Sequence, residues 1–466
     1  MLQAYNFLIF CYNFIMRFRF SAILLSAAVL IFSGRAEALR LDIMADTEMR
    51  GAAYSGIIYG GSTFNHAFLS ENTRFGLAVS GIEIENLPDA YADINLSFQS
   101  IAGLSAENLW ENPWLAQPQE SFPATDGTPY IREAYVKLGS LFSRDISAVF
   151  GRQDFSLGQG ISLGSDNSGF TGALIKADNL FWGYGIELFY FNPSRYDLNI
   201  STPGGYILNK QERRYHVYGA ALDNKTPDGR WQLYHFIQHS GNLSINGGAD
   251  PDINSENRTF TGIRYEMKKN HISFDGEIVR QGGSADTAGG GSIDYSGYAF
   301  MIKGSWEQGI YIFDNVKLRM GYGRSSAARE NDSENTCFYA DSGRRYDGLS
   351  RSGYGALAGF SLYDMQKSSA TVSGLPDGLS GISVVNGGLD IPYRKIMFSA
   401  DYFKFKADSA AVSRVTVADE IDIRVSVPLG KTFDFSMLYA YLKPGEVFGE
   451  DVKASSLAWF LVKAGF

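Results

Sequence analysis

The chain has 466 residues, and its 27 tyrosines, 33 phenylalanines and 51 glycines favour pleated surfaces and turns over helices. A formal net charge of −9 argues against a nucleic-acid partner. No Pro/Ser-rich spacer, long charge run or fixed-period repeat divides the chain, so one continuous all-β architecture is expected.

The first 38 residues are predicted to be a signal peptide. Arg17 and Arg19 supply a basic start, Phe20 to Phe32 is a short apolar core, and Ala36-Glu37-Ala38 gives the small-x-small cleavage pattern. A signal peptide that begins at Met16 would already be complete, which makes Met16 the possible functional start. A membrane anchor is the alternative, although the apolar run is short for a spanning helix.

Residues 39–466 are therefore expected to form a single exported domain. This domain keeps one cysteine, Cys337, and so cannot form an internal disulfide. It contains no apolar run near the ~20 residues that a membrane-spanning helix needs. Strands are the remaining way across a bilayer, and a spanning strand needs ~10 residues that alternate apolar with polar side chains.

Several segments show this alternation. The clearest are residues 94–98, 182–190, 316–322, 421–427 and 433–441. A soluble β-sandwich also alternates, so the period alone leaves that alternative open. Connection lengths favour the membrane interpretation, because short and long connections mostly take turns along the chain, as in outer-membrane barrels with short periplasmic turns and long external loops.

We predict a transmembrane antiparallel β-barrel of 18 strands, with 16 as the alternative. The strands are expected at 53–60, 75–84, 91–99, 130–138, 146–155, 170–178, 182–191, 213–223, 230–239, 258–268, 272–281, 295–306, 315–324, 353–363, 393–404, 419–428, 433–443 and 456–466. Segment 364–392 breaks the rule, because it is a long connection on the short side. It is either an inward-folding plug or a sign of a miscount.

The end of the chain predicts recognition by the barrel assembly machinery. Counting back from Phe466, every second residue is apolar, including Val462 and Phe460. A final strand that ends in an aromatic residue resembles the C-terminal signal by which outer-membrane proteins are recognised for assembly. Phe460, Val462 and Phe466 are the predicted signal residues.

Three stretches resemble the alginate export family of outer-membrane proteins. They are Tyr130 to Leu138 with its Arg132-Glu133 pair, Phe150 to Phe155 with Gly151-Arg152-Gln153, and Gly158-Gln159-Gly160. The resemblance implies an 18-stranded monomeric barrel that passes an anionic polysaccharide through a pore lined with arginines and lysines.

The predicted pore-lining residues are mixed in sign. They are Arg132, Glu133, Lys137, Arg152, Lys303, Lys317, Arg319, Lys395, Asp401, Asp422, Arg424 and Asp434. Lys317 and Arg319 are the candidate anion selectors, and Asp422 and Asp434 are the counter-charges that could neutralise them. Arg152 shares parity with the apolar Phe150, so it points inward only past a bulge at Gly151 or beyond the lipid zone. Pairing across strands to stiffen the wall is the alternative role for each charge.

Catalytic and metal-binding patterns are weak. Gly160 to Gly164 matches the G-x-S-x-G nucleophile elbow, but the expected context is a loop between strands rather than a strand, turn and helix. Ser165-Asp166-Asn167 lacks the S-x-x-K partner of penicillin-recognising enzymes. His235 and His239 on one strand would lie ~13 Å apart, too far for one ion. The loop at 250–256 has only a calcium-like oxygen spacing.

We therefore expect no enzyme, no cofactor and no metal. The predicted function is an outer-membrane channel of the alginate export type that passes a polysaccharide or another anionic solute by diffusion. A general or substrate-selective porin for small solutes is the alternative. The expected partners are outer-membrane lipid, the assembly machinery and the permeant.

Overall fold

The computed structural model describes residues 40–465 apart from 60–61, 86, 88, 104–126, 166–168, 182, 194–213, 244–252, 288–289, 311–312, 328–333, 339, 341–353, 359–378, 410–414 and 449–451. The predicted signal peptide and Phe466 lie outside the described residues. Within the described part, no helix is long and apolar enough to cross a membrane.

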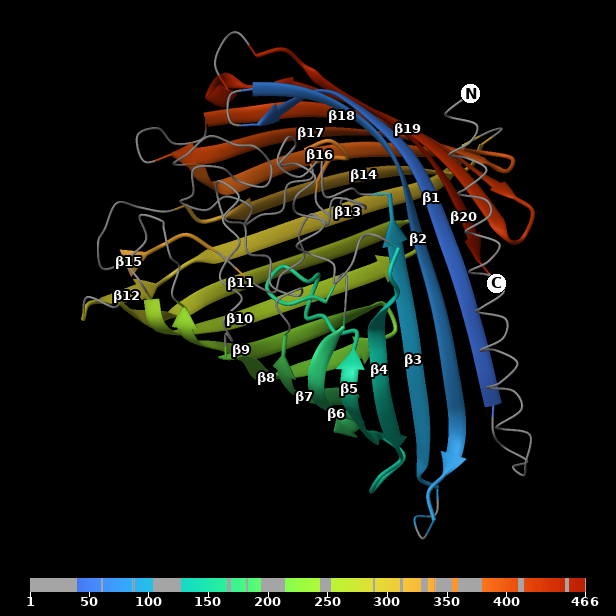
Figure 1. The fold of residues 1–466 in the computed structure, drawn as a ribbon, viewed down its shortest axis with the longest axis vertical. Helices are drawn as coiled ribbons and strands as arrows, with labels where there is room; N and C mark the ends of the chain where they lie inside the picture. Colours follow the sequence, from blue (N-terminus) through green and yellow to red (C-terminus); the bar gives the residue numbers. More distant parts are fainter. Residues whose placement is uncertain are drawn as a thin grey trace.

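Eighteen antiparallel strands make the wall of a barrel (Figure 1). They are β1 (Arg40–Tyr59), β2 (Ser62–Glu83), β3 (Tyr91–Ala102), β4 (Tyr130–Gly139), β5 (Ile146–Gln153), β6 (Phe170–Phe181), β7 (Tyr184–Asn192), β8 (Arg214–Thr226), β9 (Gly229–Leu243), β10 (Ile253–Lys269), β11 (Ile272–Thr287), β13 (Tyr298–Ile310), β14 (Phe313–Ser325), β16 (Leu379–Tyr393), β17 (Ile396–Ser409), β18 (Val415–Leu429), β19 (Phe433–Pro444) and β20 (Ser455–Gly465). Short strands β12 (Ser292–Tyr295) and β15 (Glu334–Asn335) pair in parallel beside the end of β11, and a 3-10 turn covers Glu446–Phe448.

The ring closes because β1 pairs with β2 on one edge and with β20 on the other. Each other wall strand pairs with its neighbours in chain order, from β2–β3 round to β19–β20. The prediction of 18 strands is thus confirmed, and the alternative of 16 is wrong. Closure satisfies the backbone hydrogen bonds of both would-be edge strands, as a barrel in a lipid environment requires.

One predicted strand was misplaced. The described part of the predicted strand 353–363, residues 354–358, is not a wall strand; β16 at Leu379–Tyr393 takes that place, inside the segment predicted to be a connection. The apolar alternation of β16 is interrupted by Gly387 and Gly388, which weakened its pattern in the sequence. Residues 354–358 instead form a turn that points into the barrel.

Strands β1 and β2 are longer than predicted. The first strand begins at Arg40 and β2 begins at Ser62, so the two form a long hairpin. The register pairs Thr47 with Thr73 and Glu48 with Asn72 across it. Polar residues such as these carry no apolar alternation, which is why periodicity found only the later part of each strand.

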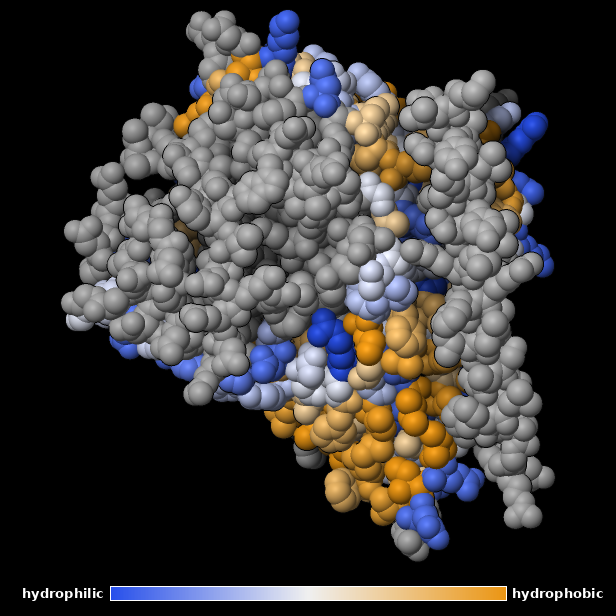
Figure 2. All heavy atoms as spheres, in the orientation of Figure 1, coloured by the Kyte–Doolittle hydropathy of each residue, from blue (hydrophilic) through white to orange (hydrophobic). Residues whose placement is uncertain are grey.

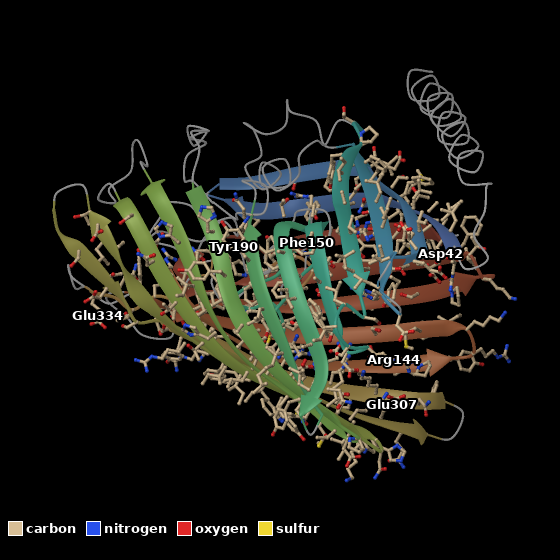
Figure 3. All side chains as sticks on the ribbon, turned by 90° about the horizontal axis from the view of Figure 1, so that it is seen from below. Asp42, Arg144, Phe150, Tyr190, Glu307 and Glu334 are labelled. Atoms are coloured by element: carbon tan, nitrogen blue, oxygen red, sulfur yellow. The ribbon has the colours of Figure 1, made fainter. Side chains whose placement is uncertain are left out.

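The two ends of the barrel differ in their connections. Two-residue turns at 227–228, 270–271 and 394–395 lie at one end with the N-terminal end of β1 and the C-terminal end of β20. Most of the longer connections, including 103–129 and 326–378, lie at the other. We call these the short-turn end and the long-loop end. Figure 3 labels Asp42, Arg144 and Glu307 near the first and Glu334 at the second.

The outer face of the wall is apolar. Phe150 and Tyr190 are each 48% exposed, and Ile302 and Tyr439 are comparably exposed on other strands. Figure 2 shows apolar residues gathered on the outside of the strands, with hydrophilic residues at their borders. An apolar band of this kind matches the lipid-facing surface of an outer-membrane barrel.

The interior holds an apolar core as well as polar residues. Leu157 and Leu163, in the connection between β5 and β6, are fully buried together with Phe191 and Phe236 of the wall. Figure 1 shows this connection turned inside the ring of strands. The connection therefore packs against the inner wall instead of extending beyond the long-loop end.

Candidate functional site

The connection between β5 and β6 forms a small hairpin inside the lumen. Ser156 bridges Gly164, the Leu157 N–H donates to the Leu163 carbonyl at 3.0 Å, and the Ser165 N–H donates to the Phe155 carbonyl at 2.9 Å. These pairings allow the segment to fold back on itself without leaving its backbone groups unsatisfied. We call residues 155–165 the inner hairpin.

The tip of the inner hairpin is held by polar groups of β9, β10 and β11. The Gly158 N–H donates to Oε1 of Gln232 at 2.8 Å, and the Gln159 N–H donates to Oε2 of Glu277. Nη1 of Arg264 donates to the Gly158 carbonyl at 2.8 Å. Backbone donors and an acceptor at the tip are therefore all matched by wall side chains.

Glu277 sits at the centre of this anchor. The hydroxyl of Tyr234 donates to its Oε1 at 2.5 Å, and the same hydroxyl lies 3.1 Å from Oγ of Ser162. Glu277 is 3% exposed and Tyr234 is 1% exposed. A buried carboxylate is costly unless it is hydrogen-bonded, and here the inner hairpin and Tyr234 supply the donors.

A second inward segment is held in the same way. The N–H of Ala356 donates to Oδ2 of Asp422 at 2.8 Å, and the N–H groups of Leu357 and Ala358 donate to the two carboxylate oxygens of Glu420 at 2.6 and 2.8 Å. We call residues 354–358 the inner turn. Both carboxylates lie on β18, so the inner turn and the inner hairpin dock on different parts of the wall.

A cavity of about 940 Å³ lies between the two inward segments and the short-turn end of the barrel. The inner hairpin and Tyr354 of the inner turn contribute to its lining, and β8 to β11, β13, β14, β16 and β17 contribute the rest. Its basic lining residues are Lys225, Arg230, Lys268, Lys303, Lys317 and Arg319, and its acidic ones are Asp228, Glu266, Asp275 and Asp401. This volume lies at the upper end of the range of about 300–1,000 Å³ for small-molecule sites.

The acidic residues of the cavity are all engaged in ion pairs. Arg264 holds Asp275 and Glu266, each at 2.8 Å, and Lys269 holds Asp228 at 2.9 Å. The fourth acidic residue, Asp401, pairs with Arg319. Each acidic residue therefore has a basic partner, but Arg264 and Arg319 are each shared between two carboxylates, so the negative charge is offset in part.

Arg319 is held between two carboxylates. It contacts Asp390 and Asp401, each at 2.8 Å, and contacts Asp390 through two nitrogens. The alternative in which Asp422 and Asp434 neutralise this arginine does not hold, because its partners are Asp390 and Asp401. Asp422 binds the inner turn, and Asp434 is exposed near the short-turn end beside the turn at 430–432.

Three cavity lysines have no carboxylate partner in the described part of the chain. Lys225, Lys268 and Lys317 line the cavity, and among the described residues none of them forms an ion pair. Lys317 lies on β14, two residues before Arg319, so both side chains reach the same face of the wall. The cavity thus presents three lysines without an ion-pair partner among the described residues, against carboxylates whose negative charge the ion pairs offset in part.

A second charged cluster lies at the closing seam of the barrel. Glu48 of β1 contacts Arg50 at 2.8 Å and Lys463 of β20 at 3.0 Å. The guanidinium groups of Arg50 and Arg424 each lie 5.7 Å from the ring centre of Trp459. These contacts join β1, β18 and β20 on the inner face, and Arg424 takes part in them as an inward residue.

The strand β4 residues lie where alternation predicts. Lys137 is 4.0 Å from Asp93, and Nδ2 of Asn95 donates to Glu133 at 3.2 Å. Arg132 lies at a register shift between β3 and β4. Lys303 lines the cavity opposite Asp275 in the register of β11 and β13.

Two predicted pore-lining residues lie elsewhere. Lys395 is exposed in the two-residue turn between β16 and β17, so it belongs to the short-turn rim and not to the wall. The register of β5 runs without a shift from Phe150 through Arg152, which keeps Arg152 on the outer-face parity near the long-loop end. Gly151 has a φ of 120° but introduces no extra residue in the pairing, so the bulge that would turn Arg152 inward is absent from β5.

Sequence reasoning missed how the inward segments dock. Asp422 was predicted to line the pore, but its partner in the inner turn is a backbone N–H group, and the same is true of Glu277 at the inner hairpin; no side-chain pattern reports such contacts. The glycines at positions 158 and 160 were the available signal for a sharp local turn. Asp390, the partner of Arg319, was missed because the strand that carries it was not predicted.

Two of the residues predicted to signal assembly, Phe460 and Val462, lie on β20 at the closing seam. Phe460 is 45% exposed on the outer face of β20, and Val462 has the same parity. Phe460 is the register partner of Gly51 on β1, and a Cβ at Gly51 would lie 2.3 Å from its ring. The aromatic ring thus covers the glycine where the last strand meets the first.

The enzyme-like motifs serve structural contacts. Ser162 is fully buried beside Tyr234, and Ser165 closes the inner hairpin. His235 contacts Thr261 and His239 contacts Asn257, both at the edge of neighbouring β10. Among the described residues no group of three or more His, Cys, Asp or Glu side chains could hold a metal ion. Asp166, Asn167 and most of the 250–256 loop lie outside the described residues.

The family comparison confirms the resemblance to alginate export proteins. Residues 125–343 match the family described as alginate export, which is just under half of the chain. The matched part runs from the approach to β4 past β15 and includes the inner hairpin. No curated protein matches the sequence.

Solved outer-membrane barrels share the fold. OpdF (OccK2) of Pseudomonas aeruginosa, solved in complex with glucuronate, superposes with a TM-score of 0.55 at 10% identity over 91% of this chain and 98% of that one. OpdL of the same organism gives 0.54, and OpdK with vanillate gives 0.52, both at 10% identity and the same coverage. The chain therefore shares the barrel fold of these outer-membrane proteins, and its residues 125–343 match the alginate export family.

Proposed function

We propose that this chain is a selective diffusion channel for small anionic solutes, with saccharide acids as the favoured class. The observation that carries the proposal is the cavity under the inner hairpin and the inner turn. Its acidic residues are bound to arginine or lysine, whereas Lys317 forms no ion pair among the described residues. Fixed positive charge in a narrow pore with low-dielectric walls concentrates anions far more than the same charge on an open surface.

The similar structures support an acid as the solute. The OpdF structure contains glucuronate, and the OpdK structure contains vanillate; both molecules are carboxylates at neutral pH. A channel that admits such a solute needs positive charge in its lumen and enough polar groups to replace part of the solute's hydration. The cavity offers lysine side chains together with Asn386 and Ser305.

A second candidate is passage of an anionic polysaccharide. It is favoured by the match of residues 125–343 to the alginate export family, a match that contains the inner hairpin. A polymer would thread through the space that the small solute would occupy. The two candidates share an anionic permeant and differ in its length.

Conductance experiments separate the candidates. The purified full-length mature protein would be placed in planar bilayers, and current blockades would be recorded with glucuronate and with long polyuronate chains added to either side. A small-solute channel gives brief blockades with glucuronate. With the polymer it gives only short blockades, because no more than the end of the polymer enters the pore. A polymer channel gives blockades whose duration grows with chain length. Cation preference with neither effect would contradict both candidates.

The remaining assignments follow from this role. We infer that the barrel works as a monomer in outer-membrane lipid, without catalysis and without a cofactor. We also infer that the barrel assembly machinery reads Phe460, Val462 and Phe466. Recovery of the intact protein as a soluble periplasmic species would contradict this placement.

A further inference from the structure

We propose that Gln159 and Tyr354 form a subsite that recognises the hydroxyl groups of a saccharide acid, while Lys317 binds its carboxylate. This inference rests on the proposed function, because it assigns a chemical class of solute to the cavity of the channel. The two polar side chains belong to different inward segments, one to the inner hairpin and one to the inner turn. All three residues line the same cavity.

Both polar groups lack hydrogen-bond partners. The amide oxygen and the amide nitrogen of Gln159 are buried without a partner among the described residues, and the hydroxyl of Tyr354 is in the same state. Buried polar groups in native proteins are nearly always hydrogen-bonded, so an exception requires an explanation. Such exceptions gather on the lining of this one cavity, where the amide oxygen of Asn386 is another, and they indicate a site whose partner is a ligand.

The backbone around these two side chains is hydrogen-bonded to the wall, whereas the polar ends of the side chains have no hydrogen-bond partner among the described residues. The Gln159 N–H is bound to Glu277, and the residues after Tyr354 are bound to Glu420 and Asp422. The amide of Gln159 can therefore turn toward the cavity without breaking a hydrogen bond. A recognition site needs a backbone that is already in place and polar side-chain groups that are available to bind a ligand.

The chemistry of the three groups fits a polyhydroxylated acid. An amide offers both an acceptor and donors, and a phenol offers both as well, which matches sugar hydroxyls that donate and accept. Burial, and then the nearby charge of Asp275, raises the pKa of Tyr354 above its ordinary value, so its hydroxyl remains a donor. An ammonium group such as that of Lys317 complements the carboxylate as a point charge.

The test compares two acids of similar size in planar bilayers. Glucuronate carries ring hydroxyls, and cyclohexanecarboxylate does not. Half-blocking concentrations would be measured for the unaltered channel, for Gln159→Met, for Tyr354→Phe and for the double variant. Tyr439→Phe, which removes a hydroxyl from the lipid face, is the matched control. Both cavity substitutions keep most of the side chain and remove groups that form no hydrogen bond with a described residue, so folded protein is expected.

The double variant should raise the half-blocking concentration of glucuronate about tenfold, as expected for losing a small number of net hydrogen bonds. Its half-blocking concentration for cyclohexanecarboxylate should stay unchanged, and the control should match the unaltered channel for both acids. Equal values for glucuronate before and after substitution, in a channel that still prefers anions, would overturn the subsite and leave the proposed function standing. Equal shifts for both acids would also overturn it. If the unaltered channel showed no preference for anions, the proposed function itself would be contradicted.

Discussion

Gly355 lies directly against the carboxylate of Glu420, so a Cβ at this glycine would stand 2.4 Å from Oε2. The same relationship joins Gly158 to Glu277, where a Cβ would stand 2.2 Å from Oε1. Both glycines have positive φ, 78° and 57°. Each inward segment thus places a left-handed glycine over a wall carboxylate, which lets the following N–H groups reach that carboxylate.

Gly355→Ala should displace the inner turn. The new methyl group would collide with Glu420, and the positive φ would add backbone strain of about 1–3 kcal/mol. The N–H groups of Leu357 and Ala358 would then lose their acceptor. We expect a higher single-channel conductance, because the turn leaves part of the lumen. Planar-bilayer recordings at fixed salt provide the measurement.

Gly430→Ala is the control for this substitution. Gly430 also has a positive φ, 86°, but a Cβ there would meet nothing within 4 Å. It lies in the turn between β18 and β19, away from the inner turn. This variant should keep the original conductance. Identical conductance in both variants would mean that the contact with Glu420 does not hold the inner turn.

Tyr234→Phe should weaken the anchor of the inner hairpin. The substitution removes the hydroxyl that donates to Glu277 and contacts Ser162. Leaving buried polar groups without their partner costs about 1–3 kcal/mol. We expect the heat-modifiable folded form to convert at lower temperature, measured by gel mobility after stepwise heating. Tyr322→Phe on the outer face should convert at the original temperature, and a shift of equal size there would argue against the anchor.

The sequence predicted the wall better than the interior. The strand count was right because lipid outside and polar groups inside impose alternation on residues such as those of β18 and β19. Strand β16 was not predicted because Gly387 and Gly388 carry no side chains and so interrupt the alternation. The inner turn and the inner hairpin escaped because their anchors are backbone N–H groups on Glu420 and Glu277, and long-range contacts of this kind leave no local period.

Arg319→Gln should lower anion preference more than Lys317→Gln. Removing the guanidinium removes one positive charge and also leaves Asp390 and Asp401 without their partner. Replacing Lys317 removes one charge and exposes no carboxylate in the described part of the wall. The comparison uses reversal potentials across a potassium chloride gradient at low ionic strength, where screening is weakest.

Adding Asp401→Asn to the Arg319→Gln variant gives the control. It removes one of the two uncovered carboxylates, so part of the lost anion preference should return. If Lys317→Gln and Arg319→Gln gave equal shifts, and Asp401→Asn restored nothing, the two carboxylates would have no influence on permeation.

Phe460→Ala should slow closure of the barrel. The ring of Phe460 covers Gly51 at the junction of β20 and β1, and its loss would expose the paired backbone to lipid. We expect a smaller folded fraction in a timed refolding assay read by heat-modifiable gel mobility. Tyr439→Ala removes a comparably exposed aromatic residue away from the β20–β1 seam. This variant should fold faster than Phe460→Ala. Equal folding in both variants would contradict a special role for the seam.

The reversal potential of the unaltered mature protein in planar bilayers, under a potassium chloride gradient at low ionic strength, tests the central claim most directly. The ion-paired carboxylates of the cavity and its three lysines that form no ion pair with a described residue predict a potential whose sign shows preference for chloride, and a decline of that preference as salt rises. A potential that shows preference for potassium would contradict the account.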